Sequence, residues 1–134
     1  MSAGRSAPLL DTHAWIWWVS DPDRLGKKAA RAIRSARVVG IAAISCWEVA
    51  ILVQKGRIKL DRGALEWIEQ SLALPGVELL PLTPAVAVRG SQLGPVFPGD
   101  PADRLIAATA LVQSVPLITR DERLQEVTFL NTVW

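Results

Sequence analysis

Apolar runs of strand length alternate along the chain with longer segments of helical character. Residues 38–44 form a continuous apolar run, as expected for a strand that is buried on both faces of a parallel sheet. Further short apolar runs are bounded by polar residues or by proline and glycine. The strands predicted in this way cover residues 7–10, 38–44, 77–82, 116–119 and 127–130.

The segments between these strands have helical composition or spacing, and several have a recognisable start or end. Thr83 followed by Pro84 predicts a helix start, because threonine caps a helix and proline fits its first turn. Gly56 predicts a helix end in the left-handed conformation. The predicted helices cover residues 12–19, 24–36, 45–55, 61–74, a segment from 83 onward and 101–115. This alternation predicts an α/β fold with three layers, in which helices cover both faces of a central, mainly parallel sheet of about five strands.

Length and composition predict one domain that folds in a reducing compartment. The 134 residues are half hydrophobic, which is enough for one sizeable core without disulfides, and Cys46 is the only cysteine. The early apolar stretch at residues 14–19 is far too short to span a bilayer, and no secretory signal precedes it. We therefore expect a single domain over residues 1–134, cytoplasmic and without membrane contact, with residues 1–6 as a flexible leader.

The net charge of +2 is small, but the basic residues are unevenly distributed. No acid occurs between Asp23 and Glu48, a stretch that holds six lysines and arginines. Such a stretch is either a solvated helix face or a patch that attracts phosphate, and the sequence leaves both interpretations open.

Acidic residues follow the predicted strands, where the ligand crevice of an open parallel sheet lies. Asp11 ends the first strand, Glu48 lies one turn into the helix after the second, and Asp121 follows residues 116–119. Asp103, in the first turn of its helix, can face the same edge. Converging carboxylates repel one another unless a cation offsets their charge, and an all-oxygen ligand set suits Mg²⁺ or Mn²⁺. Such an ion activates water for phosphodiester hydrolysis.

Each acid also has a structural explanation that involves no metal. Residues 45–48 fit a capping box, in which Glu48 bonds the backbone of Ser45. Asp100 is placed to cap the helix that carries Asp103, and Asp121 can stabilise a turn. Asp11 can cap the helix that follows it, although Thr12 is available for that role.

Other polar and aromatic residues near these acids are weaker candidates. His13 has no second histidine, and hard cations rarely use imidazole, so we expect a packing or surface residue. The clustered tryptophans favour a core or an interface over base stacking. Arg104 and Arg120 each neighbour a predicted ligand, and we retain both as possible phosphate contacts.

Four segments together resemble, in order and spacing, the PIN domain of VapC-type toxins. They are residues 9–13 (LLDTH), 45–48 (SCWE), 100–110 (DPADRLIAATA) and 119–121 (TRD). The resemblance implies a PIN-like fold and a Mg²⁺- or Mn²⁺-dependent endoribonuclease that leaves a 5′-phosphate and a 3′-hydroxyl.

Further expectations rest on the same resemblance. It implies a toxin that acts on RNA, forms a homodimer and is inhibited by an antitoxin protein. Carried over, the acids of the site are Asp11, Glu48, Asp103 and Asp121, with Asp100 as an additional acid and Thr119 as a polar neighbour. Two alternatives remain: a non-catalytic PIN-like module that binds RNA or protein, and a housekeeping PIN nuclease without an antitoxin.

Overall fold

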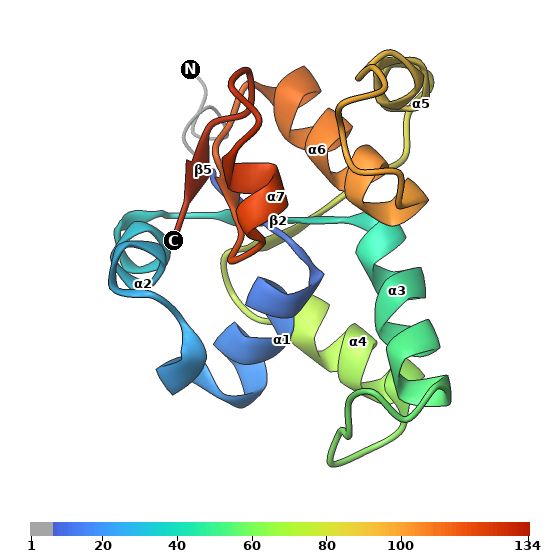
Figure 1. Cartoon of the computed structure of the whole chain (residues 1–134). Coiled ribbons are helices and arrows are strands. Elements are labelled where there is room, and N and C mark those ends of the chain that lie inside the picture. The colour runs from blue at the N-terminus through green and yellow to red at the C-terminus, as the bar shows by residue number, and fades with distance from the viewer. Residues whose placement is uncertain (1–6) are drawn as a thin grey trace.

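The computed structural model describes residues 7–134 and has a five-stranded parallel sheet with helices on both faces (Figure 1). The strand order is β3-β2-β1-β4-β5. The strands are β1 (Leu9–Leu10), β2 (Val39–Ala42), β3 (Val77–Leu80), β4 (Leu117–Ile118) and β5 (Thr132–Val133). The predicted three-layer α/β architecture is therefore confirmed. The leader predicted at residues 1–6 lies outside the described residues.

Seven α-helices and one short 3-10 helix connect the strands of the described chain. They are α1 (Thr12–Ser20), η2 (Pro22–Arg24), α2 (Lys27–Ser35), α3 (Ala43–Gln54), α4 (Ala64–Leu72), α5 (Pro84–Ser91), α6 (Pro101–Gln113) and α7 (Glu122–Gln125). Within residues 7–134, no helix combines the length and the apolar character that a bilayer crossing requires.

The two faces of the sheet bury different sets of side chains, because successive strand residues point in opposite directions. Leu9 pairs in register with Leu117, and Leu10 pairs with Ile118. The first pair packs with the buried residues of α6 and α7. The second pair packs with α1 and α2, and with Trp67 of α4. The central strands β1 and β4 are thus buried on both faces.

Several predicted helix boundaries agree with the structure. Thr83 caps α5, since its hydroxyl accepts a hydrogen bond from the Val86 amide at 3.2 Å. Gly56 follows α3 with a φ of +69°, and its amide donates to Val53 O at 3.0 Å. The next amide, of Arg57, donates to Leu52 O at 2.9 Å, which completes a Schellman turn.

Two predicted boundaries are wrong. The last strand is β5 at Thr132–Val133, whereas residues 127–130 form a turn closed by the Leu130 amide on Val127 O at 3.2 Å. Leu130 is buried in the core and Val127 packs against it, whereas Phe129 is 47% exposed, so the apolar run does not reflect the alternation of a strand. Helix α3 begins at Ala43, so the predicted second strand is shorter than its apolar run.

Candidate active site

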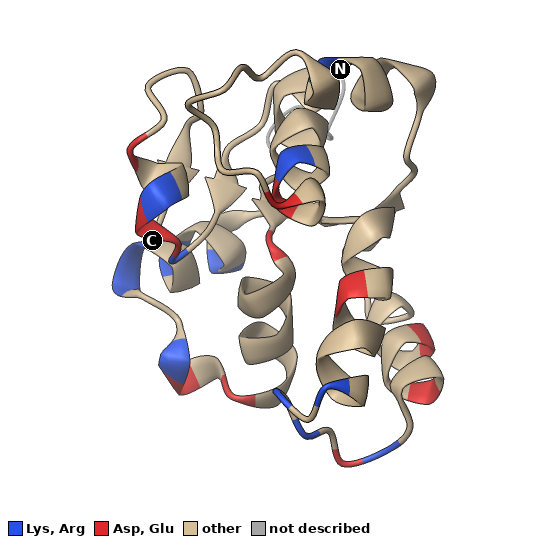
Figure 2. Ribbon diagram, turned by 45° about the vertical axis from the view of Figure 1, so that its right-hand side comes forward, with Lys and Arg blue, Asp and Glu red and all other residues tan. Residues whose placement is uncertain are grey.

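Six carboxylates line one cleft of about 510 Å³ beyond the carboxyl ends of the strands. Strand β1 is the central strand of the sheet. The chain continues from β1 to β2 and β3 on one side of it, and later returns to β4 and β5 on its other side. This reversal is where open α/β sheets form their ligand crevice. Figure 2 shows acidic segments from different parts of the chain near the middle of the molecule. Five of the six are the acids named from the sequence, and the sixth, Glu122, is exposed: the five are Asp11, Glu48, Asp100, Asp103 and Asp121.

Glu48 is held by the hydroxyl group of Thr12, and the capping box that the sequence left open as an alternative does not form. The Thr12 hydroxyl donates a hydrogen bond to Glu48 Oε1 and is also hydrogen-bonded to Ser45 Oγ at 3.0 Å. Because α3 begins at Ala43, Ser45 lies inside the helix and does not cap it. Both hydroxyl residues are buried, so they fix the direction in which Glu48 leaves α3.

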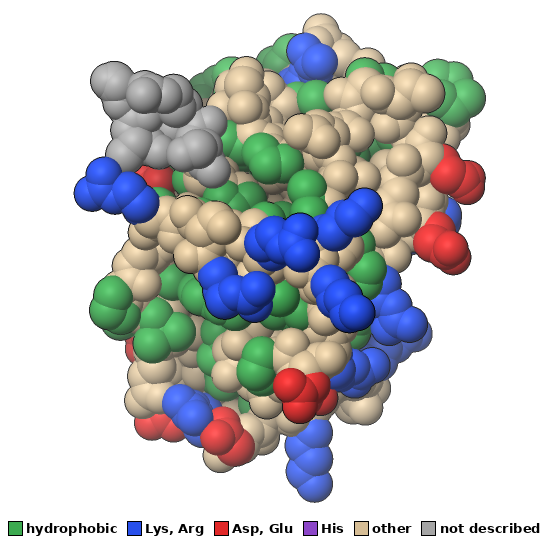
Figure 3. Space-filling model, turned by 90° about the vertical axis from the view of Figure 1, so that its left-hand side faces the viewer, with side chains coloured by type: hydrophobic (Ala, Val, Ile, Leu, Met, Phe, Trp, Pro, Cys, Tyr) green, Lys and Arg blue, Asp and Glu red, His purple; other side chains and the backbone are tan. Residues whose placement is uncertain are grey.

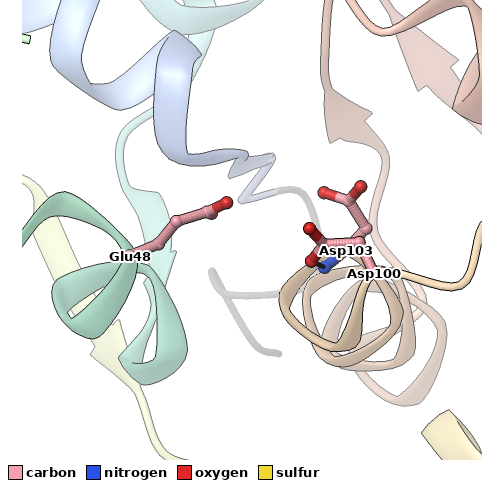
Figure 4. A group of neighbouring side chains, drawn as sticks. All are labelled: Glu48, Asp100 and Asp103. Carbon is pink, nitrogen blue, oxygen red and sulfur yellow. Dashed lines mark hydrogen bonds between the residues drawn. The ribbon is translucent and has the colours of Figure 1, made fainter. Parts of the chain in front are cut away.

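Glu48 approaches two aspartates at the start of α6. One carboxylate oxygen from each of Glu48, Asp100 and Asp103 lies within 4.8 Å of the others. Figure 4 shows Glu48 reaching from α3 toward the two aspartates. Asp100 also caps α6, as predicted, by accepting from the amides of Ala102 at 2.8 Å and Asp103 at 3.2 Å. A capping role therefore does not remove Asp100 from the cluster.

Asp11 follows β1 directly and caps α1. Its Oδ1 accepts a hydrogen bond from the Ala14 amide at 2.9 Å, so Asp11 fills the role that the sequence left to Thr12. The pKa of Asp11 is raised to about 6, mainly by burial and to a smaller extent by the charge on Glu48, while hydrogen bonds from Thr119 and Ala14 oppose the shift. The protein thus holds this carboxylate at the edge of the sheet at a cost in solvation.

Asp103 experiences the strongest crowding in the cleft. Desolvation raises its pKa to about 7, and the charges of Asp100, Glu48 and Asp121 act in the same direction. The positive charge of Arg123 lowers this pKa and opposes the shift. Near neutral pH, an additional positive charge would therefore stabilise the ionised form of Asp103.

Asp121 has a cationic partner of its own. Arg123 donates through Nη2 to Asp121 Oδ2 at 2.7 Å and through Nε to Asp121 Oδ1 at 3.2 Å, and this interaction lowers the pKa of Asp121. The same Nη2 lies 3.4 Å from Asp103 Oδ2. The positive charge of Arg123 thereby bridges the carboxylates of Asp121 and Asp103.

Comparison with known proteins identifies the family. The model of the PIN domain family matches residues 9–130. The chain belongs to the PIN-domain family. This PIN domain is 43% identical over 117 residues to Ribonuclease VapC22 of Mycobacterium tuberculosis, a match that covers 87% of this chain and 88% of that protein.

Solved structures agree with the fold of this PIN domain. The DNA-bound VapBC structure from Salmonella typhimurium has a TM-score of 0.70 at 16% identity, and the match covers 95% of this chain and 96% of that chain. VapBC2 from Rickettsia felis, bound to a DNA fragment from the promoter, has a TM-score of 0.69 at 15% identity, with coverages of 94% and 96%. At these identities the likeness supports the fold alone.

The remaining predicted residues of this PIN domain differ in their position. Thr119 is buried, and its Oγ1 accepts a hydrogen bond from the Asp121 amide at 3.0 Å, so it fixes the backbone that carries the Asp121 carboxylate. Arg120 is exposed and lines the cleft. Arg104 instead donates to the carbonyls of Gly94 at 2.9 Å and Phe97 at 3.3 Å, and we no longer retain it as a phosphate contact. His13 is exposed at the rim of the cleft.

Sequence reasoning missed three residues that control the acids: Thr12, Ser45 and Arg123. Thr12 directly follows Asp11, and this adjacency suggested only a helix cap. Ser45 is three residues before Glu48, a spacing that also fits a capping box. Arg123 is two residues after Asp121, and nothing in the sequence distinguishes it from other surface arginines. Only the three-dimensional contacts assign these roles.

The donor set of this PIN domain fits a hard divalent cation. All six acidic side chains of the cleft offer oxygen, the ligand atom that Mg²⁺ and Mn²⁺ prefer. The raised pKa values of Asp11 and Asp103 show that crowding and burial oppose ionisation. A bound divalent ion would offset both effects.

The metal-free protein should lose stability as the pH rises from about 4 to about 7. Folding raises the pKa of Asp11 to about 6 and that of Asp103 to about 7, from the ordinary aspartate value of 3.8. The native state therefore binds more protons in this window, and its free energy of unfolding should fall by on the order of a few kcal/mol. The lowered pKa of Asp121 acts below the window, where stability is lost on further acidification.

Urea denaturation in EDTA across this pH range measures the effect. The Asp103→Asn variant should flatten the upper part of the curve, because it removes the group with the higher pKa. A wild-type stability that rises with pH between about 5 and about 7 would contradict the crowding described above.

Proposed function

We propose that this PIN domain is a metal-dependent endoribonuclease, the toxin of a toxin–antitoxin pair. The observation that carries the proposal is the convergence of six carboxylates in one cleft, in a chain 43% identical to Ribonuclease VapC22. The acids of the cleft come from segments far apart in the sequence, and no acid expected from the sequence lies elsewhere in the molecule. Hydrolysis of RNA phosphodiester bonds is the chemistry that such a cleft supports best.

Glu48, Asp100 and Asp103 are the residues best placed to hold Mg²⁺ or Mn²⁺, with Asp11 beside them in the cleft. When bound, the ion would polarise a phosphoryl oxygen and lower the pKa of water. We propose Mg²⁺ or Mn²⁺ because both prefer oxygen ligands, and the cleft offers neither cysteine nor a second histidine.

The side chains around the acids hold them in fixed directions. Thr12 occupies Oε1 of Glu48, and the helix cap of Asp11 engages its Oδ1. Asp121 is fixed by Arg123 on one side and, through its amide, by Thr119 on the other. Such outer contacts restrict the rotation of ligating carboxylates and so reduce the reorganisation that substrate binding requires. We assign Asp121 to orienting the ion or its water.

A non-catalytic PIN-like module that binds RNA or protein is the main alternative. It requires no concentrated negative charge, and a set of acids facing an RNA phosphate would weaken binding. The structure instead keeps six acids in the cleft and supports Glu48 with two buried hydroxyl groups. This costly arrangement favours catalysis over binding alone.

The proposed protein partners are an antitoxin and a second copy of the chain. Ribonuclease VapC22 is a relative, and solved structures of the same fold include toxin–antitoxin complexes, which supports an antitoxin over a solitary housekeeping nuclease. The edge strand β3 and helix α5 carry exposed apolar side chains: Leu79 is 47% exposed, and Val88 is 56% exposed. We propose that this side forms the homodimer.

The Asp103→Asn substitution should abolish RNA cleavage while the fold is retained. Asparagine has almost the same size as aspartate but carries no charge. We therefore expect kcat/KM to fall by more than about a hundredfold, a larger loss than that caused by changing a residue that only supports a metal ligand. A fluorescent RNA assay with Mg²⁺ or Mn²⁺ measures it, and EDTA should stop the wild-type reaction. Glu66→Gln, in the exposed part of α4, is the matched control. A metal-supplied wild type that cuts no RNA would favour the binding module.

The Val88→Asp substitution should convert the protein to a monomer. A buried unpaired carboxylate at the proposed interface would cost more than an apolar contact contributes. Light scattering coupled to size exclusion measures the mass, and Val96→Asp, at a position 88% exposed, is the control. A dimer that survives Val88→Asp would exclude this side of α5 from the interface.

A further inference from the structure

Two arginines from distant segments lie on one tryptophan ring at the mouth of the acidic cleft. The Arg24 guanidinium carbon is 4.7 Å from the centroid of the Trp17 ring, and that of Arg120 is 5.7 Å from it. Trp17 and Arg120 both line the acidic cleft. We call these three residues the Trp17 clamp.

Three parts of the backbone supply the clamp, and a fourth, the C-terminus, packs against it. Trp17 belongs to α1, Arg24 ends η2, and Arg120 follows β4. The C-terminal Trp134 packs its ring edge-on against Trp17 at 5.8 Å, and its carbonyl accepts from the Ala29 amide at 3.1 Å. The arrangement joins the start of α2 to the edge of β5.

Backbone contacts fix the positions of both arginines. A Cβ atom at Gly26 would lie 2.3 Å from the Trp134 carbonyl oxygen, so glycine allows the chain after Arg24 to approach the C-terminus. On the other side, the Thr119 amide donates to Val133 O at 3.1 Å, directly before Arg120. The two guanidinium groups therefore extend from anchored segments.

Both guanidinium groups are available to an anion. Arg24 and Arg120 are exposed, and within residues 7–134 neither makes an ion pair or a side-chain hydrogen bond. Their neighbour in the cleft, Arg123, is instead committed to Asp121. Stacking on an aromatic ring orients a guanidinium plane without occupying its N–H donors, and these donors match phosphate oxygens.

Positive charge continues from the clamp along α2. This helix carries exposed Lys27, Lys28, Arg31 and Arg34. Figure 3 shows Lys and Arg side chains gathered on this side of the molecule, with few acidic side chains among them. Such a surface attracts a polyanion toward the cleft and offsets the repulsion that the acids of the cleft exert on phosphate.

We propose that the Trp17 clamp binds the backbone phosphate of the RNA strand next to the bond that is cut. The inference rests on the proposed ribonuclease function. The acids of the cleft then act on one phosphodiester with their cation, while Arg24 and Arg120 hold a neighbouring phosphate outside the cluster. Phosphate contacts position a strand without reading its bases, so the clamp contributes equally to RNAs of different sequence.

The test is RNA binding by an Arg24→Gln/Arg120→Gln double variant, in an Asp103→Asn background that leaves the strand intact. Affinity for two single-stranded oligoribonucleotides of unrelated sequence is measured by fluorescence anisotropy at several salt concentrations. The double variant should bind both RNAs roughly tenfold to a hundredfold more weakly. The slope of log affinity against log salt should become shallower by about 1.4, that is about 0.7 for each lost phosphate contact.

Two controls separate the clamp from general charge and from folding. Arg89→Gln in α5 removes one exposed arginine from another helix and should leave the affinity within about twofold of the parent. The Arg24→Lys/Arg120→Lys pair keeps the charges and should restore most of the salt slope. Circular dichroism of each variant checks that the fold is retained.

The outcomes distinguish the clamp from the ribonuclease itself. Wild-type cleavage of RNA with Mg²⁺ or Mn²⁺ would support the proposed function. If the double variant nevertheless keeps the affinity and salt slope of the Asp103→Asn protein, the proposed clamp is wrong and the proposed function stands. If the otherwise wild-type protein cuts no RNA, the proposed function fails first. An equal loss of RNA affinity in Arg89→Gln would also overturn the clamp, because it would show only a general charge effect.

Discussion

Repulsion among carboxylates at one edge of the sheet is the constraint on which the rest of the site depends. The parallel strands bring Asp11 and Asp121 to the same edge, and the helices α3 and α6 add Glu48 and Asp103. Isolated carboxylates in water ionise readily, but here burial and neighbouring charge raise the pKa of Asp11 and of Asp103. A fold selected for stability alone would not collect these groups. Their collection is physically reasonable where a cation is shared among them.

The protein offsets this repulsion only in part, and by different means for different acids. Helix N-termini stabilise Asp11 and Asp100 through backbone amides, and Thr12 supports Glu48. Arg123 neutralises Asp121 and reaches Asp103 only at 3.4 Å. The raised pKa of Asp103 shows that these contacts leave it incompletely compensated. The negative charge that remains uncompensated lies where the carboxylate oxygens of Glu48, Asp100 and Asp103 converge.

The sequence was sufficient for the architecture and for the convergence of the acids, because both follow from strand periodicity. A carboxylate directly after a buried parallel strand must lie at the carboxyl edge, and Asp11 and the strand before Asp121 obey this rule. The helical start before Asp103 was equally readable, since Asp100 and Pro101 form a standard cap. The four family segments strengthened this interpretation, and the family match over residues 9–130 confirmed it.

The sequence was insufficient where a side chain could serve either a local role or a contact with a residue distant in the sequence, because only the fold decides between the two. Thr12 had the chemistry of a helix cap, but its hydroxyl donates to the distant Glu48, and Asp11 caps the helix. Arg104 neighbours a proposed ligand, yet its guanidinium bonds a loop that closes over α6. Val127 and Leu130 pack into the core from a turn, and a short apolar run does not distinguish such a turn from a strand.

Calorimetric titration of the metal-free protein with Mn²⁺ in buffers of different ionisation enthalpy tests the shared cation most directly. If the acids share a divalent ion, near neutral pH the wild type should bind Mn²⁺ saturably and release protons, because Asp11 and Asp103 are partly protonated before binding. The proton release should diminish in Asp103→Asn together with the affinity. Saturable binding that is unchanged in a folded Asp103→Asn protein, or no saturable binding by the wild type, would contradict the account.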